Sequence, residues 1–103
     1  MRIVLSTCRL EEADHITDTL LKERLIASAN HVPGVITKLW WKGEMISQQE
    51  VLLILRTREE LIWKVEKRIE ELNSFEVPEV ASIEIKEWNS KYANWLLSVT
   101  QQK

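Results

Sequence analysis

The stretch that decides the fold is residues 35–55, with the sequence VITKLWWKGEMISQQEVLLIL. In its first seven residues, hydrophobic and β-branched side chains recur at every second position, which is the period of a β-strand. Gly43 then separates this segment from a second one, which ends in the unbroken apolar run Val51–Leu55. We therefore predict two long strands, 32–42 and 44–55, joined by a hairpin that turns near Gly43.

Shorter elements flank this hairpin on both sides. The apolar run Ile3–Leu5 predicts an N-terminal strand that is buried on both faces. Over residues 11–24, acidic residues come first, apolar residues follow at helical spacing and basic residues come last, which predicts a first helix. Thr57 and Glu60 fit a capping box at the start of a second helix over residues 58–72.

The C-terminal part completes a recognisable order of elements. Alternating residues over 81–86 predict a fourth strand, and a last helix begins near Asn89 or Ser90. Its apolar face consists of Tyr92, Trp95, Leu96 and Val99. The order β-α-β-β-α-β with an appended helix is typical of the ferredoxin-like α+β fold, an antiparallel four-stranded sheet with helices on one face. A chain of 103 residues has room for one such domain, residues 1–103.

The predicted hairpin is longer than the helices that would cover it. Its 11-residue arm over 32–42 spans about 37 Å, whereas the 15-residue second helix spans about 22 Å. The overhang leaves a strand edge and apolar faces uncovered unless another subunit covers them, so we expect an oligomer. The tryptophans are better explained by core or subunit contacts than by a stacking platform: Trp40, Trp41, Trp63, Trp88 and Trp95.

Composition excludes several classes of protein. Lysine and arginine number 14 and aspartate and glutamate 16, a net charge of −2, which does not indicate a nucleic-acid or membrane binder. The N-terminal and third strands also lack the stacking aromatics of an RNA-recognition surface. Val51–Leu55, the longest apolar run, is far shorter than a membrane-spanning helix. The single cysteine, Cys8, cannot form an intramolecular disulfide, so we expect a cytoplasmic protein.

Short motifs along nearly the whole chain are shared with one known family. They are Leu21–Ala27, Ala29-Asn30, Pro33-Gly34-Val35, Trp41-Lys42-Gly43, Glu50, Thr57, Pro78-Glu79 and Tyr92 followed by Trp95. Together they resemble the CutA family, the divalent-cation tolerance proteins. The resemblance implies a ferredoxin-like subunit in a homotrimer, with long hairpins contributing to intersubunit sheets. It also implies a role in the response to divalent metal ions such as copper.

The chain departs from this family at positions that matter for metal binding. Family members commonly have Cys-Ala-Asn where this chain has Ser28-Ala29-Asn30, a Tyr in place of Leu39, and His-Pro-Tyr in place of Asn73-Ser74-Phe75. A hydroxyl and a carboxamide bind copper poorly compared with a thiolate and an imidazole. We therefore predict no required cofactor and only weak binding of copper, the divalent cation that the resemblance implies.

Three further side chains can bind metals, but their spacing does not form a sequence-local zinc site. Cys8 follows the first strand, where a thiol can meet a soft metal, although a small semi-buried side chain is the simpler interpretation. His15 lies off the apolar stripe of the first helix and is expected to be solvated. His31 adjoins Pro33-Gly34 and is expected to have a role in a bend. Cys8 is thus the one candidate metal ligand.

Charged side chains are expected to gather where strands end. Glu50 precedes the apolar third strand and Glu79 lies beside the fourth, so both are predicted to approach Arg56, either to bind an ion or small ligand or to hold a subunit interface. The full set predicted to bind a ligand in an intersubunit cleft is Trp41, Glu50, Arg56, Asn73, Phe75, Glu79 and Trp95.

Catalysis receives little support from the sequence, so no catalytic residue is predicted. There is no nucleophile-elbow context, no glycine-rich phosphate loop and no assignable carboxylate pair. The leading hypothesis is a non-catalytic binding or signalling protein. The alternative is a small-ligand enzyme, similar to acylphosphatase, that uses an intersubunit cleft; its anion loop would be residues 6–10, which contain Arg9 but no glycine.

Overall fold

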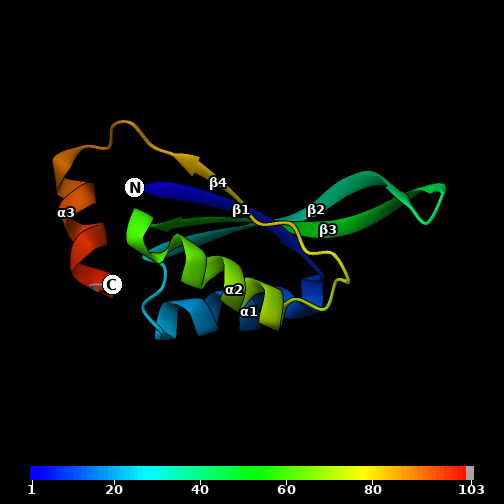
Figure 1. The fold of residues 1–103 in the computed structure, drawn as a ribbon, viewed down its shortest axis with the longest axis horizontal. Coiled ribbons are helices and arrows are strands. Elements are labelled where there is room, and N and C mark those ends of the chain that lie inside the picture. The colour runs from blue at the N-terminus through cyan, green and yellow to red at the C-terminus, as the bar shows by residue number, and fades with distance from the viewer. Residues whose placement is uncertain (102–103) are drawn as a thin grey trace.

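The predicted order of elements is confirmed by the computed structural model, which describes residues 1–101 (Figure 1). The elements are β1 (Arg2–Cys8), α1 (Leu10–Lys22), β2 (Ser28–Trp41), β3 (Glu44–Thr57), a 3₁₀ turn η1 (Glu59–Leu61), α2 (Ile62–Leu72), β4 (Ala81–Glu84) and α3 (Ser90–Val99). The four strands form one antiparallel sheet in the order β2-β3-β1-β4. This is the ferredoxin-like α+β arrangement.

Helices α1 and α2 lie side by side against one face of the sheet, and α3 lies at the end opposite the hairpin tip (Figure 1). The core forms between these two helices and alternate residues of β1 and β3, since every second side chain of a strand points to the same face. Its largest fully buried side chains include Ile16, Leu20, Leu53, Leu55, Leu61 and Ile69.

Neither α1 nor α2 covers the second face of the sheet, and α3 meets it only at the end where Tyr92 contacts Ser28. β1 is therefore buried on one face only, at Val4, Ser6 and Cys8, and the prediction that both faces are buried is wrong for the single chain. The residues on the other face are half-buried or exposed. We call this set the uncovered face: Ile3, Leu5, Leu52, Ile54 and Ile83.

The predicted hairpin is present and turns at Lys42-Gly43. Both residues have positive φ, +49° and +84°, as a two-residue type I′ turn requires. The molecule extends 45 Å along its longest axis, whereas the 13 residues of α1 span only about 20 Å. The tip of the hairpin therefore projects beyond the helices (Figure 1). Trp40 and Met45 are 71% and 75% exposed there.

Strand β2 begins earlier than predicted, at Ser28. Residues 28–32 already pair with β3, and a bulge between Val32 and Val35 absorbs Pro33-Gly34 without ending the strand. Gly34 has a φ of +74°, which a glycine adopts without steric cost. The bend that the sequence predicted beside Pro33-Gly34 is thus a bulge within one continuous strand.

The predicted capping box is wrong. Thr57 is fully buried at the end of β3, and its hydroxyl donates to the Leu25 carbonyl at 2.6 Å. The helical segment starts after Arg58 as the 3₁₀ turn η1, without a side-chain cap, and Glu60 is exposed. The Thr57 hydroxyl satisfies a carbonyl in the connection between α1 and β2, which is why it does not cap the following turn.

Replacing Thr57 with valine should destabilise the protein by about 1–3 kcal/mol, because the shape is kept while a buried carbonyl loses its donor. Denaturant midpoints at one fixed protein concentration would measure this change. Thr57→Ser, which retains the hydroxyl, and Glu60→Ala, which changes an exposed side chain, are the controls. A Thr57→Val midpoint equal to that of wild type would contradict the assigned hydrogen bond.

Candidate functional site

The candidate site lies where β1 ends and β3 continues into the hairpin. Cys8, the last residue of β1, pairs with Val51, so β3 has no β1 neighbour before that residue. The segment 73–79 between α2 and β4 lies beside this part of β3 and encloses a cavity of about 500 Å³. We call it the hairpin cavity. It is lined by Leu39, Trp41, Ile46, Phe75 and Val77, by Glu50, Glu76 and Glu79, and by Thr7, Arg9, Thr37, Gln48 and Ser74.

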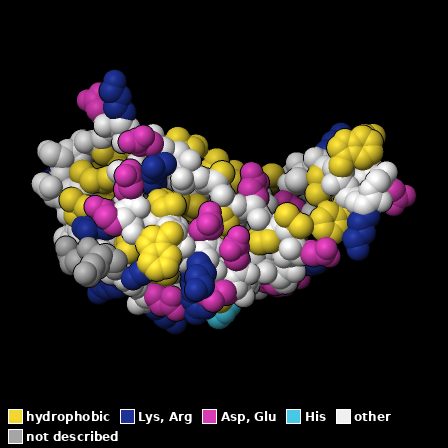
Figure 2. Space-filling model, in the orientation of Figure 1, with side chains coloured by type: hydrophobic (Ala, Val, Ile, Leu, Met, Phe, Trp, Pro, Cys, Tyr) yellow, Lys and Arg dark blue, Asp and Glu magenta, His cyan; other side chains and the backbone are white. Residues whose placement is uncertain are grey.

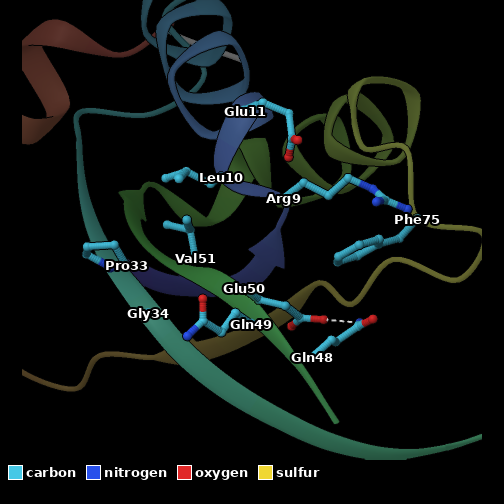
Figure 3. Close-up of a pocket in the computed structure, with 10 residues that line it drawn as sticks. All are labelled: Arg9, Leu10, Glu11, Pro33, Gly34, Gln48, Gln49, Glu50, Val51 and Phe75. Carbon is cyan, nitrogen blue, oxygen red and sulfur yellow. Dashed lines mark hydrogen bonds between the residues drawn. The ribbon is translucent and has the colours of Figure 1, made fainter. Parts of the chain in front are cut away.

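Glu50 is the buried charge of this cavity, with only 5% of its surface exposed. Thr37 donates its hydroxyl to one carboxylate oxygen at 2.8 Å, and Gln48 donates its amide to the other. Figure 3 shows the Glu50 and Gln48 side chains meeting, in a second, adjoining cavity of about 290 Å³ that Glu50 also lines. Within the described chain, no lysine, arginine or histidine forms an ion pair with Glu50.

Hydrogen bonds fix the segment that forms the opposite wall. The Asn73 amide donates to the Thr7 carbonyl at 2.9 Å, and its side-chain oxygen accepts the Phe75 N–H at 2.9 Å. At the other end of the segment, the Ser6 hydroxyl donates to the Glu79 carbonyl at 2.6 Å. Asn73 is 7% exposed and does not line the hairpin cavity, so it positions Phe75 instead of meeting a ligand there.

Arg9 holds Phe75 from the other side. Its guanidinium lies 5.3 Å from the centre of the Phe75 ring, and its Nε donates to the Ser74 hydroxyl at 3.0 Å. Arg9 is the only residue between β1 and α1. It therefore connects the N-terminus of α1 to the wall of the cavity through its contacts with Ser74 and Phe75. The sequence had indicated Arg9 only for the enzyme alternative.

Four of the seven predicted ligand-binding residues line the hairpin cavity: Trp41, Glu50, Phe75 and Glu79. Thr37 and Gln48, which donate hydrogen bonds to Glu50, were not predicted from the sequence. The signal for them was present, because Gln48 lies two residues before Glu50 and pairs with Thr37 across the hairpin. Residues so related share one face of a strand pair.

Arg56 and Trp95 belong to a different part of the molecule. Arg56 is six residues from Glu50 on β3, about 20 Å along the strand. It donates to the Ser28 hydroxyl at 3.3 Å, and that hydroxyl lies 3.0 Å from the Tyr92 hydroxyl. Tyr92 contacts the rings of Trp95 and Trp88, each with centroids 5.3 Å apart. The structure therefore does not bring Arg56 and Trp95 to Glu50 and Glu79.

The candidate metal ligand Cys8 is fully buried, where a semi-buried position was expected. Burial, with smaller contributions from the nearby Glu12 and Glu50 carboxylates, raises the pKa of its thiol to about 11. Burial in this way disfavours the thiolate that metals bind. Across residues 1–101, no group of three or more histidine, cysteine, aspartate or glutamate side chains is arranged to hold a metal ion.

The two histidines lie apart from the cavity. His15 is exposed on α1, as predicted. His31 lies on β2 next to the bulge and not in a loop, and its Nε2 is 2.9 Å from the Thr17 hydroxyl. Its Nδ1 is 3.8 Å from an Asp14 carboxylate oxygen. His31 therefore links β2 to α1.

The fold and its cavity define a class: a ferredoxin-like domain whose β2–β3 hairpin projects beyond its helices. A family profile described as "CutA1 divalent ion tolerance protein" matches residues 2–99. The chain belongs to this CutA1 family. None of the helices in the part of the chain that the structure describes is long and apolar enough to cross a membrane.

Individual relatives agree with this assignment. The divalent-cation tolerance protein CutA of Pyrococcus horikoshii is 39% identical over 92 residues, 89% of each chain. That of Thermus thermophilus is 38% identical over 95 residues, 91% of this chain and 92% of the other. The crystal structure of CutA1 from Pyrococcus horikoshii matches with a TM-score of 0.94 at 38% identity, covering 99% of this chain and all of that one.

A rice relative extends the likeness to eukaryotes. The crystal structure of CutA1 from Oryza sativa has a TM-score of 0.95 at 32% identity and covers 99% of this chain and 94% of that one. These matches confirm the family and the ferredoxin-like fold that the sequence indicated.

Cys8 should make stability depend on alkaline pH. Its pKa in the folded state, about 11, lies above the ordinary value of 9.0, so burial of the neutral thiol stabilises the protein fully below about pH 9. This contribution is lost as the pH rises towards 11. Denaturant midpoints between pH 8 and 11 should fall more steeply for wild type than for Cys8→Ala; parallel curves would contradict the assignment.

Proposed function

We propose that this chain assembles as a homotrimer that acts in cytoplasmic tolerance of divalent metal ions, through a binding or signalling role without catalysis. The observation that carries the proposal is the family match over residues 2–99, together with relatives named divalent-cation tolerance proteins. A cytoplasmic location is compatible with a cysteine that is free and buried.

Two apolar surfaces support the trimer. The uncovered face of the sheet carries half-buried aliphatic side chains on the side away from α1 and α2, and Ile83 on it is 48% exposed. The hairpin tip adds Trp40 and Met45, and hydrophobic side chains gather at this projecting end (Figure 2). Strand β2 is also an edge strand of 14 residues. Long open edges and apolar patches of this kind are normally covered by another subunit.

The connection between β1 and α1 favours binding over catalysis. The alternative of an acylphosphatase-like enzyme needs a loop that wraps around a phosphate, and here only Arg9 lies between the strand and the helix. Its guanidinium is engaged by Ser74 and Phe75. The Glu50 oxygens are engaged by Thr37 and Gln48. These contacts suit a preorganised binding cavity, and the hairpin cavity is the site that we assign to the binding role.

A tightly bound copper ion does not fit the ligands of one chain. Ser28 and Asn73 stand where the family commonly has cysteine and histidine. Ser28 is opposite Arg56, which is opposite Ile3, whereas Asn73 bonds Thr7, so about 14 Å of strand separates the two positions. Copper would require ligands from more than one subunit.

Light scattering after size-exclusion chromatography should give three times the 12.1 kDa chain mass at micromolar concentration. Trp40→Lys should shift the population towards smaller species, because it places a charge on the exposed hairpin tip. The matched control is Trp63→Lys on α2, where the tryptophan is 63% exposed. A monomer mass for wild type across this range would contradict the proposal.

Calorimetric titration under argon should show weak Cu(II) binding by wild type, unchanged in Cys8→Ser because that thiol is buried. Ser28→Cys should bind more tightly, since it adds a soft thiolate ligand. The double variant with Asn73→His should gain no more than the single variants, given their separation in the chain. A tenfold further gain would instead show that neighbouring subunits bring the two positions together.

A further inference from the structure

The hairpin cavity contains a buried carboxylate without a counter-ion. Only 5% of the Glu50 surface is exposed, and both hydrogen bonds to its carboxylate come from neutral donors, Thr37 and Gln48. A buried charge is costly unless it is paired. A carboxylate offers about four lone-pair positions, so two hydrogen bonds leave acceptor capacity on Glu50. The group is therefore suited to receive a cation from outside the chain.

The net charge of the cavity wall also favours binding of a cation. Glu76 and Glu79 also line the cavity, whereas Arg9 is the one basic residue among the lining side chains described. Arg9 is already engaged by the Ser74 hydroxyl and the Phe75 ring. Three carboxylates and one guanidinium give the wall a negative potential, which concentrates cations at its entrance.

The remaining wall is apolar and aromatic. Trp41 and Phe75 line it together with aliphatic side chains, and both rings already lie under cations of their own chain. The Lys42 ammonium lies 5.7 Å from the Trp41 ring centre, and the Arg9 guanidinium lies 5.3 Å from that of Phe75. A volume of about 500 Å³ is in the range of small-molecule sites. A ligand that is part hydrocarbon and part cation matches such a wall.

A metal ion fits the hairpin cavity less well than an organic cation does. Hard divalent cations take about six oxygen ligands, and softer ones take several nitrogen or sulfur ligands. Three glutamates line the cavity, but in the described chain no three histidine, cysteine, aspartate or glutamate side chains are arranged to hold a metal ion. Gln48 directs its amide N–H, which is a donor, at Glu50. An alkylammonium needs only a few acceptors, and its carbon chain gains from contact with aromatic rings.

We propose that the hairpin cavity binds a small organic cation of the primary-amine class. The ammonium pairs with Glu50, and the carbon chain lies against Trp41 and Phe75. This inference rests on the proposed function, because it names the ligand class of the same binding cavity.

Calorimetric titration of the assembled protein with n-butylammonium chloride tests the proposal, with 1-butanol as the uncharged probe. We expect saturable binding of the ammonium and at least tenfold weaker binding of the alcohol. Glu50→Gln should weaken butylammonium binding at least tenfold. The control is Glu44→Gln, which removes the same charge from an exposed position on the same strand outside the cavity. Equal binding by Glu50→Gln and wild type would overturn the proposal.

A second variant guards against a folding artefact. Trp41→Leu keeps the carboxylate and removes one aromatic wall, and it should weaken butylammonium binding several-fold while circular dichroism and assembly mass stay as in wild type. A Trp41→Leu protein that keeps its fold and full affinity would also count against the proposed contact.

A divalent-ion titration separates the two levels of the proposal. If Mn(II) or Cu(II) binds in a Glu50-dependent manner and butylammonium does not, the cavity remains a binding site and the organic-cation assignment is wrong. If neither the divalent ions nor butylammonium bind, the proposed binding role of the cavity is wrong as well.

Discussion

The pairing of β2 with β3 over 14-residue strands is the constraint on which the rest of the structure depends. β1 has only seven residues and α1 thirteen, so neither can follow the hairpin to its tip. The helices cover the part of the sheet where three or four strands lie side by side. The outer part of the hairpin is left as a two-stranded ribbon, which is marginally stable in water without further packing. The outer ribbon of the hairpin thus lacks the packing that the helices give the rest of the sheet.

The hairpin cavity follows from the same mismatch in length. Because β1 ends opposite Val51, the preceding residue of β3 is the first without a β1 neighbour, and that residue is Glu50. The segment after α2 occupies the vacated side, fixed by the Asn73 amide and the Ser6 hydroxyl. A glutamate one residue later would have entered the apolar core, since Val51 is 2% exposed on the core face. The strand period therefore decides that the charge faces a cavity.

Periodicity in the sequence predicted the elements well because each buried face follows the period of its strand or helix. The failures have tertiary causes. Thr57 and Glu60 have the spacing of a capping box, but the Thr57 hydroxyl donates its hydrogen bond to the buried Leu25 carbonyl instead. Pro33-Gly34 looks like a chain break, but a bulge lets pairing with β3 continue on both sides. Local spacing contains no information about either partner, because both lie at least fifteen residues away along the chain.

The site was predicted in part for a related reason. Glu50, Trp41, Phe75 and Glu79 line one cavity within the chain, but Arg56 was expected beside them because it lies at the other end of the same apolar run. An extended strand keeps its two ends about 3.4 Å apart per residue, so a charge at one end cannot reach a charge at the other. The two ends instead acquire different surroundings: a carboxylate between neutral donors at one, and a guanidinium near the hydroxyls of Ser28 and Tyr92 at the other. Separation along β3 is what leaves Glu50 without an internal counter-ion and the cavity open to an external one.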